Sequence, residues 1–230
     1  MLHQETVEKG TLDLIRRFMQ DSKFNSFYLV GGTALALRIG HRKSIDIDLF
    51  TDNAFQSTEI KAHLQDFYSV ENIRAISNGV FSVVDGVKVD IIVHQYPLLS
   101  KIEETEGIRM LSLLDISAMK LNAIHGNGTR LKDFIDIYAL LEYMPLEDML
   151  KACERKYPDV NAAMARNALL YHDDIDHEVK IDFIGKPIEW QLVSERLKQA
   201  ATNPKLTFKP QQSLKQSRNI RQDRKKGPRL

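Results

Sequence analysis

Three acidic residues in the first half of the chain have the type and spacing of a metal site. Asp46 and Asp48 alternate with apolar residues between positions 44 and 50, which predicts a strand with both carboxylates on one face. Two like charges this close are unfavourable unless a cation lies between them. Asp90 lies on the polar face of another predicted strand. The three acids could therefore hold Mg²⁺, or Mn²⁺, because hard divalent ions prefer oxygen ligands.

The residues that precede this strand could bind phosphate. Gly31, Gly32 and Thr33 lie where a predicted strand at 27–30 turns into a predicted helix. Glycine lets the backbone approach a ligand closely, and a helix N-terminus directs free N–H groups at an anion, to which Thr33 would add its hydroxyl. Such a turn and its metals could hold a nucleoside triphosphate while one metal activates an acceptor hydroxyl and the other stabilises the leaving pyrophosphate.

Further charged residues could complete such a site. Lys120 lies on a predicted helix with apolar or small residues three and four positions to either side, so its ammonium leaves a mostly apolar face. Arg42 and Lys43 precede the aspartate strand and could contact phosphate or the acceptor. Each feature also has an ordinary interpretation. The aspartates could be a solvated strand face, Lys120 a surface lysine, and Lys132 with Asp136 an i,i+4 ion pair.

The order of these features resembles a known family. Segments 31–37 and 42–50 resemble the first motif of the nucleotidyltransferases of the polymerase-beta superfamily, and they closely resemble the AbiEii/AbiGii toxin family. Thr33 stands where serine is commoner in that motif and keeps the hydroxyl. The Lys132-Asp133-x-x-Asp136 stretch is similar to a Lys-Asp-x-x-Asp stretch of the toxin family, so the resemblance spans residues 25–142.

The resemblance implies an enzyme that moves a nucleoside monophosphate from a triphosphate to an acceptor hydroxyl, with Mg²⁺ as cofactor. It implies a toxin of a toxin–antitoxin or phage-defence pair, acting on RNA such as the 3′ end of transfer RNA, with an antitoxin as partner. A small-molecule (aminoglycoside-type) acceptor and a catalytically silent, partner-binding member stay open as alternatives. The expected catalytic residues are Asp46, Asp48, Asp90, Lys120 and Asp133, the metal ligands are Asp46, Asp48 and Asp90, and the nucleotide-binding residues are Gly31, Gly32, Thr33, Arg42, Lys43, Lys120 and Asp136.

The predicted elements give an α/β (α+β) fold, and the resemblance implies a polymerase-beta-like fold with a mixed sheet and a helical C-terminal part. Residues 1–100 contain predicted helices at 5–20 and 58–67 and strands at 72–77, 80–84 and 87–93. Residues 101–202 contain predicted helices at 112–126, 131–143, 146–156, 160–171 and 188–201. We expect residues 203–230 to be a basic, flexible tail, because Lys205 to Leu230 contain nine basic residues and one acid.

Composition excludes several classes of protein. Of 230 residues, 43% are hydrophobic and 27% charged, which disfavours collagen-like, coiled-coil and wholly disordered chains. The single cysteine, Cys153, cannot form an internal disulfide, and no apolar run approaches the roughly 20 residues of a membrane helix. No P-loop or serine-hydrolase motif occurs. We therefore expect a cytoplasmic protein, and the basic tail is interpreted as either an RNA-binding arm or a solubilising end.

Overall fold

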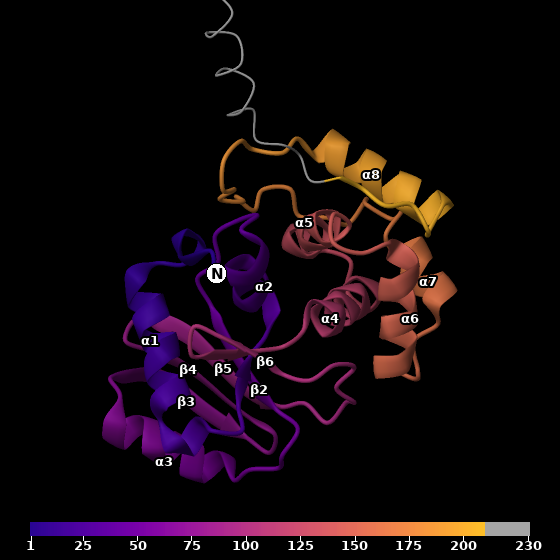
Figure 1. Ribbon diagram of the computed structural model, residues 1–230. Helices are drawn as coiled ribbons and strands as arrows, with labels where there is room; N and C mark the ends of the chain where they lie inside the picture. The colour runs from indigo at the N-terminus through magenta and orange to yellow at the C-terminus, as the bar shows by residue number, and fades with distance from the viewer. Residues whose placement is uncertain (210–230) are drawn as a thin grey trace, which may run out of the picture.

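A computed structural model describes residues 1–209, and its centre is a seven-stranded mixed sheet (Figure 1). The strand order is β3-β4-β5-β2-β1-β7-β6. The strands are β1 (Tyr28–Leu29), β2 (Ile47–Thr51), β3 (Val70–Ile76), β4 (Gly79–Val84), β5 (Val87–Val93), β6 (Glu103–Thr105) and β7 (Ile108–Met110). β2 runs parallel to β5 and antiparallel to β1. The predicted hairpin between β4 and β5 is confirmed, and it turns at Asp85 and Gly86, both with positive φ.

Helices pack against the sheet, and further helices make up most of the second half of the described chain. They are α1 (Lys9–Gln20), α2 (Gly31–Ile39), α3 (Ser57–Phe67), α4 (Leu113–Gly126), α5 (Leu131–Leu140), α6 (Leu146–Lys156), α7 (Ala162–Ala168) and α8 (Trp190–Thr202), with short 3-10 turns at Gln4–Thr6 and Ser22–Phe24. α1 and α3 lie against the sheet, whereas α4 to α8 gather beside it (Figure 1). Ser112 caps α4 by accepting a hydrogen bond from the Asp115 N–H, as its spacing predicts.

A buried ion pair ties the two halves together. Asp115 of α4 and Lys156 of α6 are fully buried, with Nζ and Oδ1 2.8 Å apart. The Asp115 carboxylate also accepts hydrogen bonds from the N–H groups of Leu99 and Ser100, and Lys156 donates to the Pro97 carbonyl. Every charge in this group has a partner, so the pair fixes the chain where it crosses from the sheet to the helices.

Two parts of the fold differ from the sequence predictions. β6 and β7 form a hairpin that we did not predict, because three-residue strands are too short to show an alternating pattern. β7 pairs with β1, so the sheet extends beyond residue 100 to Met110. Phe208, in the segment expected to be a flexible tail, packs against the core with the Arg196 guanidinium 5.3 Å from its ring centroid. Residues 210–230, the greater part of that tail, lie outside the described residues.

No helix between residues 1 and 209 is both long enough and apolar enough to span a bilayer.

Candidate active site

Two of the predicted acids are neighbours on adjacent strands. Asp48 of β2 and Asp90 of β5 are directly paired in the parallel register, and neighbouring strands lie about 4.8 Å apart. Burial raises the pKa of Asp48 to about 6, and the negative charge of Asp90 acts in the same direction, whereas Lys120 and Lys88 oppose it. A carboxylate held in this environment gains from a nearby cation.

Asp90 is only partly satisfied by protein groups. Its Oδ2 accepts a hydrogen bond from Lys88, 2.9 Å away, and the Lys88 side chain is 58% exposed. Its Oδ1 is buried and has no hydrogen-bond partner in the described part of the chain. An unpaired buried carboxylate oxygen is costly, so Asp90 has the capacity for one more cation.

Asp46 is the third of the predicted metal ligands, and it lies just before β2. β2 begins at Ile47, not at residue 44 as the alternation predicts, and Asp46 is half-buried. Within residues 1–209 no group of three His, Cys, Asp or Glu side chains is arranged to hold a metal ion. The described conformation therefore presents the Asp48 and Asp90 pair, with Asp46 on the adjoining loop.

The two glycines bring the helix start close to these side chains. Gly31 has φ +70°, and a Cβ there would overlap the Asp48 carboxylate. A Cβ on Gly32 would lie 2.6 Å from the Arg42 Nη2. Only glycine accommodates both the positive φ at position 31 and this contact with Asp48. The backbone at Gly31 therefore lies in close contact with the Asp48 side chain, as expected of glycines at a ligand site.

Thr33 makes a different contact from the predicted one. The side chain is buried, and its hydroxyl donates to the Asp46 carbonyl and lies 2.9 Å from the Ser44 hydroxyl. The hydroxyl is therefore committed to the loop that carries Asp46 rather than facing an anion. This bond fixes the loop to the start of α2.

Lys120 is buried in a cluster of charges. Its ammonium lies 2.6 Å from Asp133 Oδ1 and 2.7 Å from Asp136 Oδ2. Burial alone would lower the pKa of Lys120, but the charges of Asp136 and Asp133 raise it above its ordinary value. Lys120 is therefore a protonated lysine, and the interpretation as a solvated surface lysine is wrong. An ammonium has three N–H donors, so one remains for a ligand.

Asp136 has no oxygen to spare for a substrate. The Arg42 guanidinium binds both of its oxygens through Nε and Nη2, at 2.7 and 3.0 Å, and His41 Nε2 lies 2.7 Å from Oδ1. Burial would raise the pKa of Asp136, but Arg42, Lys120 and the His41 hydrogen bond hold it well below its ordinary value. The expected Lys132–Asp136 pair does not form, since Asp136 is fully buried among these groups. Asp136 is thus a structural anchor.

Asp133 differs from Asp136 in one respect. It is 1% exposed, and its Oδ1 binds Lys120, but its Oδ2 has no hydrogen-bond partner among the described residues. Arg130 approaches Oδ2 only to 3.6 Å. Asp133 therefore keeps one buried oxygen that can accept a further hydrogen bond.

Arg42 is a buried cation that contacts other protein groups. It is 3% exposed and holds Asp136 through a bidentate contact, with Nη1 donating to the Lys43 carbonyl. The neighbouring Lys43 side chain is 49% exposed and pairs with Asp182 at 3.3 Å. Of the two cations, only Lys43 faces solvent.

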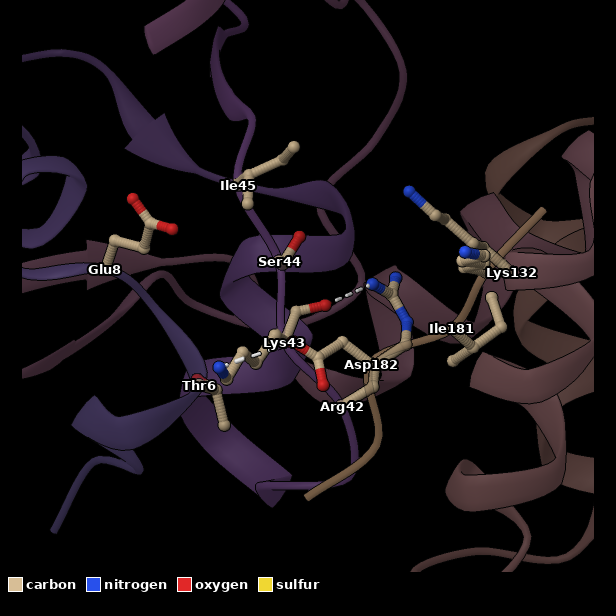
Figure 2. A pocket seen from close by; sticks show the side chains of 10 residues that line it. Thr6, Glu8, Arg42, Lys43, Ser44, Ile45, Lys132, Ile181 and Asp182 are labelled. Carbon is tan, nitrogen blue, oxygen red and sulfur yellow. Dashed lines mark hydrogen bonds and ion pairs between the residues drawn. The ribbon is translucent and has the colours of Figure 1, made fainter. Parts of the chain in front are cut away.

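A pocket of about 170 Å³ adjoins the loop that carries Asp46 (Figure 2). Ser44 and Ile45 form part of its wall, and Figure 2 places Lys132 across from them and Asp182 beside Lys43. Neither Asp48 nor Lys120 lines it. The pocket is therefore beside the aspartate pair and separate from it.

The sequence did not indicate two contributors to this region. His41 belongs to the Asp136 cluster, yet as a lone histidine 95 positions from its partner it carries no recognisable spacing. Lys180 lines the pocket from the long connection between α7 and α8. Neither position could be linked to the site before the chain was folded.

Comparisons with solved structures show the fold. JHP933 from Helicobacter pylori superimposes with a TM-score of 0.52 at 17% identity, covering 95% of this chain and 99% of that one. An H. pylori protein described as a candidate nucleotidyltransferase gives a TM-score of 0.52 at 18% identity, covering 85% and 94%. The fold is that of the polymerase-beta-like nucleotidyltransferases.

Sequence comparisons define the family. The family model described as nucleotidyl transferase AbiEii toxin, type IV TA system, matches residues 13–84 and 81–219. The uncharacterized protein aq_aa25 of Aquifex aeolicus (strain VF5) is 33% identical over 180 residues, or 76% of this chain and 85% of that protein. The chain belongs to the AbiEii nucleotidyltransferase toxin family, and it is a nucleotidyltransferase.

Proposed function

We propose that this nucleotidyltransferase binds a nucleoside triphosphate and divalent metal at Asp46, Asp48 and Asp90, and transfers a nucleoside monophosphate to an RNA hydroxyl. The observation that carries the proposal is the in-register Asp48–Asp90 pair beside Gly31. In the reaction, the acceptor oxygen forms a bond to the α-phosphorus while the bond from that phosphorus to the bridging oxygen breaks, and pyrophosphate leaves with that electron pair.

The residues fit a divalent metal. Asp90 Oδ1 lacks a partner in the described chain, and Lys88, which contacts Oδ2, is exposed enough to move away. Mg²⁺ or Mn²⁺ bound there would supply charge neutralisation for the phosphates and a lowered pKa for the acceptor hydroxyl. Asp46, on the half-buried loop, would be the third ligand.

Lys120 and Asp133 would act on the substrates directly. Lys120 has one uncommitted N–H, which would donate to a phosphate oxygen and offset charge that develops during transfer. The free Oδ2 of Asp133 would accept a hydrogen bond from the nucleotide or from the acceptor hydroxyl. Arg42, His41 and Asp136 would act as positioning residues, because Arg42 and His41 hold the Asp136 carboxylate that pairs with Lys120.

RNA is the acceptor that the charges favour. Three lysines against two acids line the pocket beside Asp46, and nine basic residues lie between Lys205 and Leu230. A cationic aminoglycoside would require the opposite charge in its acceptor pocket. The family description adds that the relatives are toxins of type IV systems, so we propose that this chain is such a toxin and has a cognate antitoxin.

The experiment is a transfer assay. Purified protein is incubated with Mg²⁺, each α-labelled triphosphate in turn, and total transfer RNA or a panel of small hydroxyl compounds. We expect label in RNA from one preferred triphosphate, and none with EDTA. Label in small compounds alone would contradict an RNA acceptor. No transfer to any acceptor, together with no triphosphate binding in calorimetry, would contradict the enzyme assignment at this site.

A further inference from the structure

The pocket beside Asp46 combines segments that are far apart in the sequence. Its walls come from Thr6 and Glu8 near the N-terminus, from the 42–45 loop, from α5 and from residues 180–182 (Figure 2). At about 170 Å³ it is smaller than the roughly 300–1,000 Å³ typical of pockets for drug-sized ligands. A single phosphate group suits this size better than a whole nucleotide.

Main-chain hydrogen bonds hold these walls together. The Lys43 N–H donates to the Asp182 carbonyl at 2.7 Å, the Ile184 N–H to the His41 carbonyl at 3.2 Å, and the Ser44 N–H to the Thr6 carbonyl at 2.9 Å. These bonds fix the walls of the pocket relative to one another. A preformed site loses less entropy when it binds.

The pocket lining holds more cations than acids: Arg42, which is committed to Asp136, and three lysines, against Glu8 and Asp182. The lysines are Lys43, Lys132 and Lys180, and only Lys43 has an ion-pair partner among residues 1–209. The Lys43 pair with Asp182 is 3.3 Å long between side chains 49% and 70% exposed, so it contributes little. Lys132 and Lys180 thus bring two uncommitted positive charges to one small pocket, and like charges placed together favour an anion between them.

The position of the pocket indicates which substrate supplies the anion. Gly31, Asp48, Asp90 and Lys120, which a triphosphate and its metals would contact, are absent from its lining. Ser44 in its wall is two residues from Asp46, so the wall lies about 7 Å along the chain from the metal loop. A phosphate bound here would belong to the second substrate.

We propose that Lys43, Lys132 and Lys180 bind a backbone phosphate of the RNA acceptor and thereby place the acceptor end beside Asp46. This inference rests on the proposed function, since it assumes that RNA is the acceptor. The site would contribute to acceptor affinity and not to triphosphate affinity.

The test compares two charge-matched double variants of the full chain. Lys132→Gln with Lys180→Gln removes the two uncommitted pocket charges. Lys61→Gln with Lys198→Gln removes two lysines on α3 and α8 that do not line the pocket. Binding of fluorescein-labelled transfer RNA is measured by anisotropy from 50 to 300 mM salt, triphosphate binding by calorimetry, and transfer by label incorporation.

We expect the pocket variant to bind RNA about tenfold more weakly, with the slope of log affinity against log salt reduced by about one, while triphosphate affinity is unchanged. Its KM for RNA should rise about tenfold with kcat within about twofold, and the control variant should resemble wild type. Equal RNA affinity and slope in both variants would overturn the inference alone. A loss of triphosphate affinity in the pocket variant would assign the pocket to the nucleotide instead. Absence of RNA binding by wild type, with transfer only to small molecules, would overturn both proposals.

Discussion

The aspartate pair combines a cost to stability with the metal-binding role that we propose for it. Asp48 is held beside Asp90 in a buried setting that favours its neutral form. We therefore predict that Asp48→Asn raises the free energy of unfolding at pH 7 by on the order of 1 kcal/mol. The same change should lower transfer by about 10³-fold or more, because a metal ligand is lost.

Urea unfolding and the transfer assay measure the two effects, with exposed Asp66→Asn on α3 as the control that should alter neither. A stable Asp48→Asn variant that keeps full activity would contradict the metal-ligand assignment.

The two acids on α5 should respond differently to the same substitution. Asp136→Asn leaves the buried Arg42 with a neutral partner, while Lys120 keeps Asp133, so we predict a loss of about 3–5 kcal/mol in the free energy of unfolding. Asp133→Asn should cost about 1–2 kcal/mol, because Asp136 still neutralises Lys120, and should reduce transfer at least tenfold in folded protein. Urea titrations and rate measurements would compare them. Equal losses of stability would contradict the division into an anchor and a substrate-facing acid.

His94 gives the protein a pH-dependent stability. Burial, with the charge of Lys156, lowers the pKa of His94 to about 4, while the unfolded chain protonates near 6.5. Below pH 6.5 the unfolded state therefore binds the additional proton, and stability falls with pH until the folded histidine titrates near 4. Between pH 7 and 4.5 wild type should lose on the order of 2 kcal/mol more than His94→Gln. Urea unfolding of wild type and His94→Gln at both pH values measures the difference. An equal loss of unfolding free energy in the two proteins would contradict this prediction.

At the scale of elements, the start of α2 is joined to β2 by a contact that only glycine permits. The positive φ of Gly31 and its proximity to the Asp48 carboxylate both oppose a Cβ. We predict that Gly31→Ala costs about 1–3 kcal/mol of stability and lowers transfer sharply, because the helix start must shift relative to the metal strand.

Gly10→Ala is the matched control, since Gly10 lies in α1 and a Cβ added there would meet no atom within 4 Å. That variant should be as stable as wild type or slightly more so. Thermal unfolding of both variants measures the contrast, and equal melting temperatures would contradict the close-contact interpretation.

Across the whole molecule, local sequence patterns predicted most helices and strands. Contacts between residues far apart in the sequence could not be predicted in this way. The alternation around Asp90 and the Asp85-Gly86 turn predicted β4 and β5, because a strand's period of two is visible within seven residues. The contact between Arg42 and Asp136 joins residues 94 positions apart, and nothing in either segment specifies it.

The same distinction between local patterns and long-range contacts applies to the residues of the candidate site. Asp48 and Asp90 were each predicted on the polar face of a strand, and the parallel register pairs the two residues directly. The protein contacts of Arg42 and Thr33 could not be predicted, because burial by the rest of the chain decides which protein groups a polar side chain meets. The edge strands β6 and β7 escaped prediction because they are short and partly polar.

We propose that the aspartate pair holds the metal that serves the triphosphate. The most direct measurement is a crystal structure with Mn²⁺ and a non-hydrolysable triphosphate, in which anomalous scattering locates the metal. We predict a peak within about 2.2 Å of carboxylate oxygens of Asp48 and Asp90, with Lys88 displaced and Lys120 donating to a phosphate. A metal and nucleotide bound elsewhere, with the Lys88–Asp90 contact intact, would contradict the account.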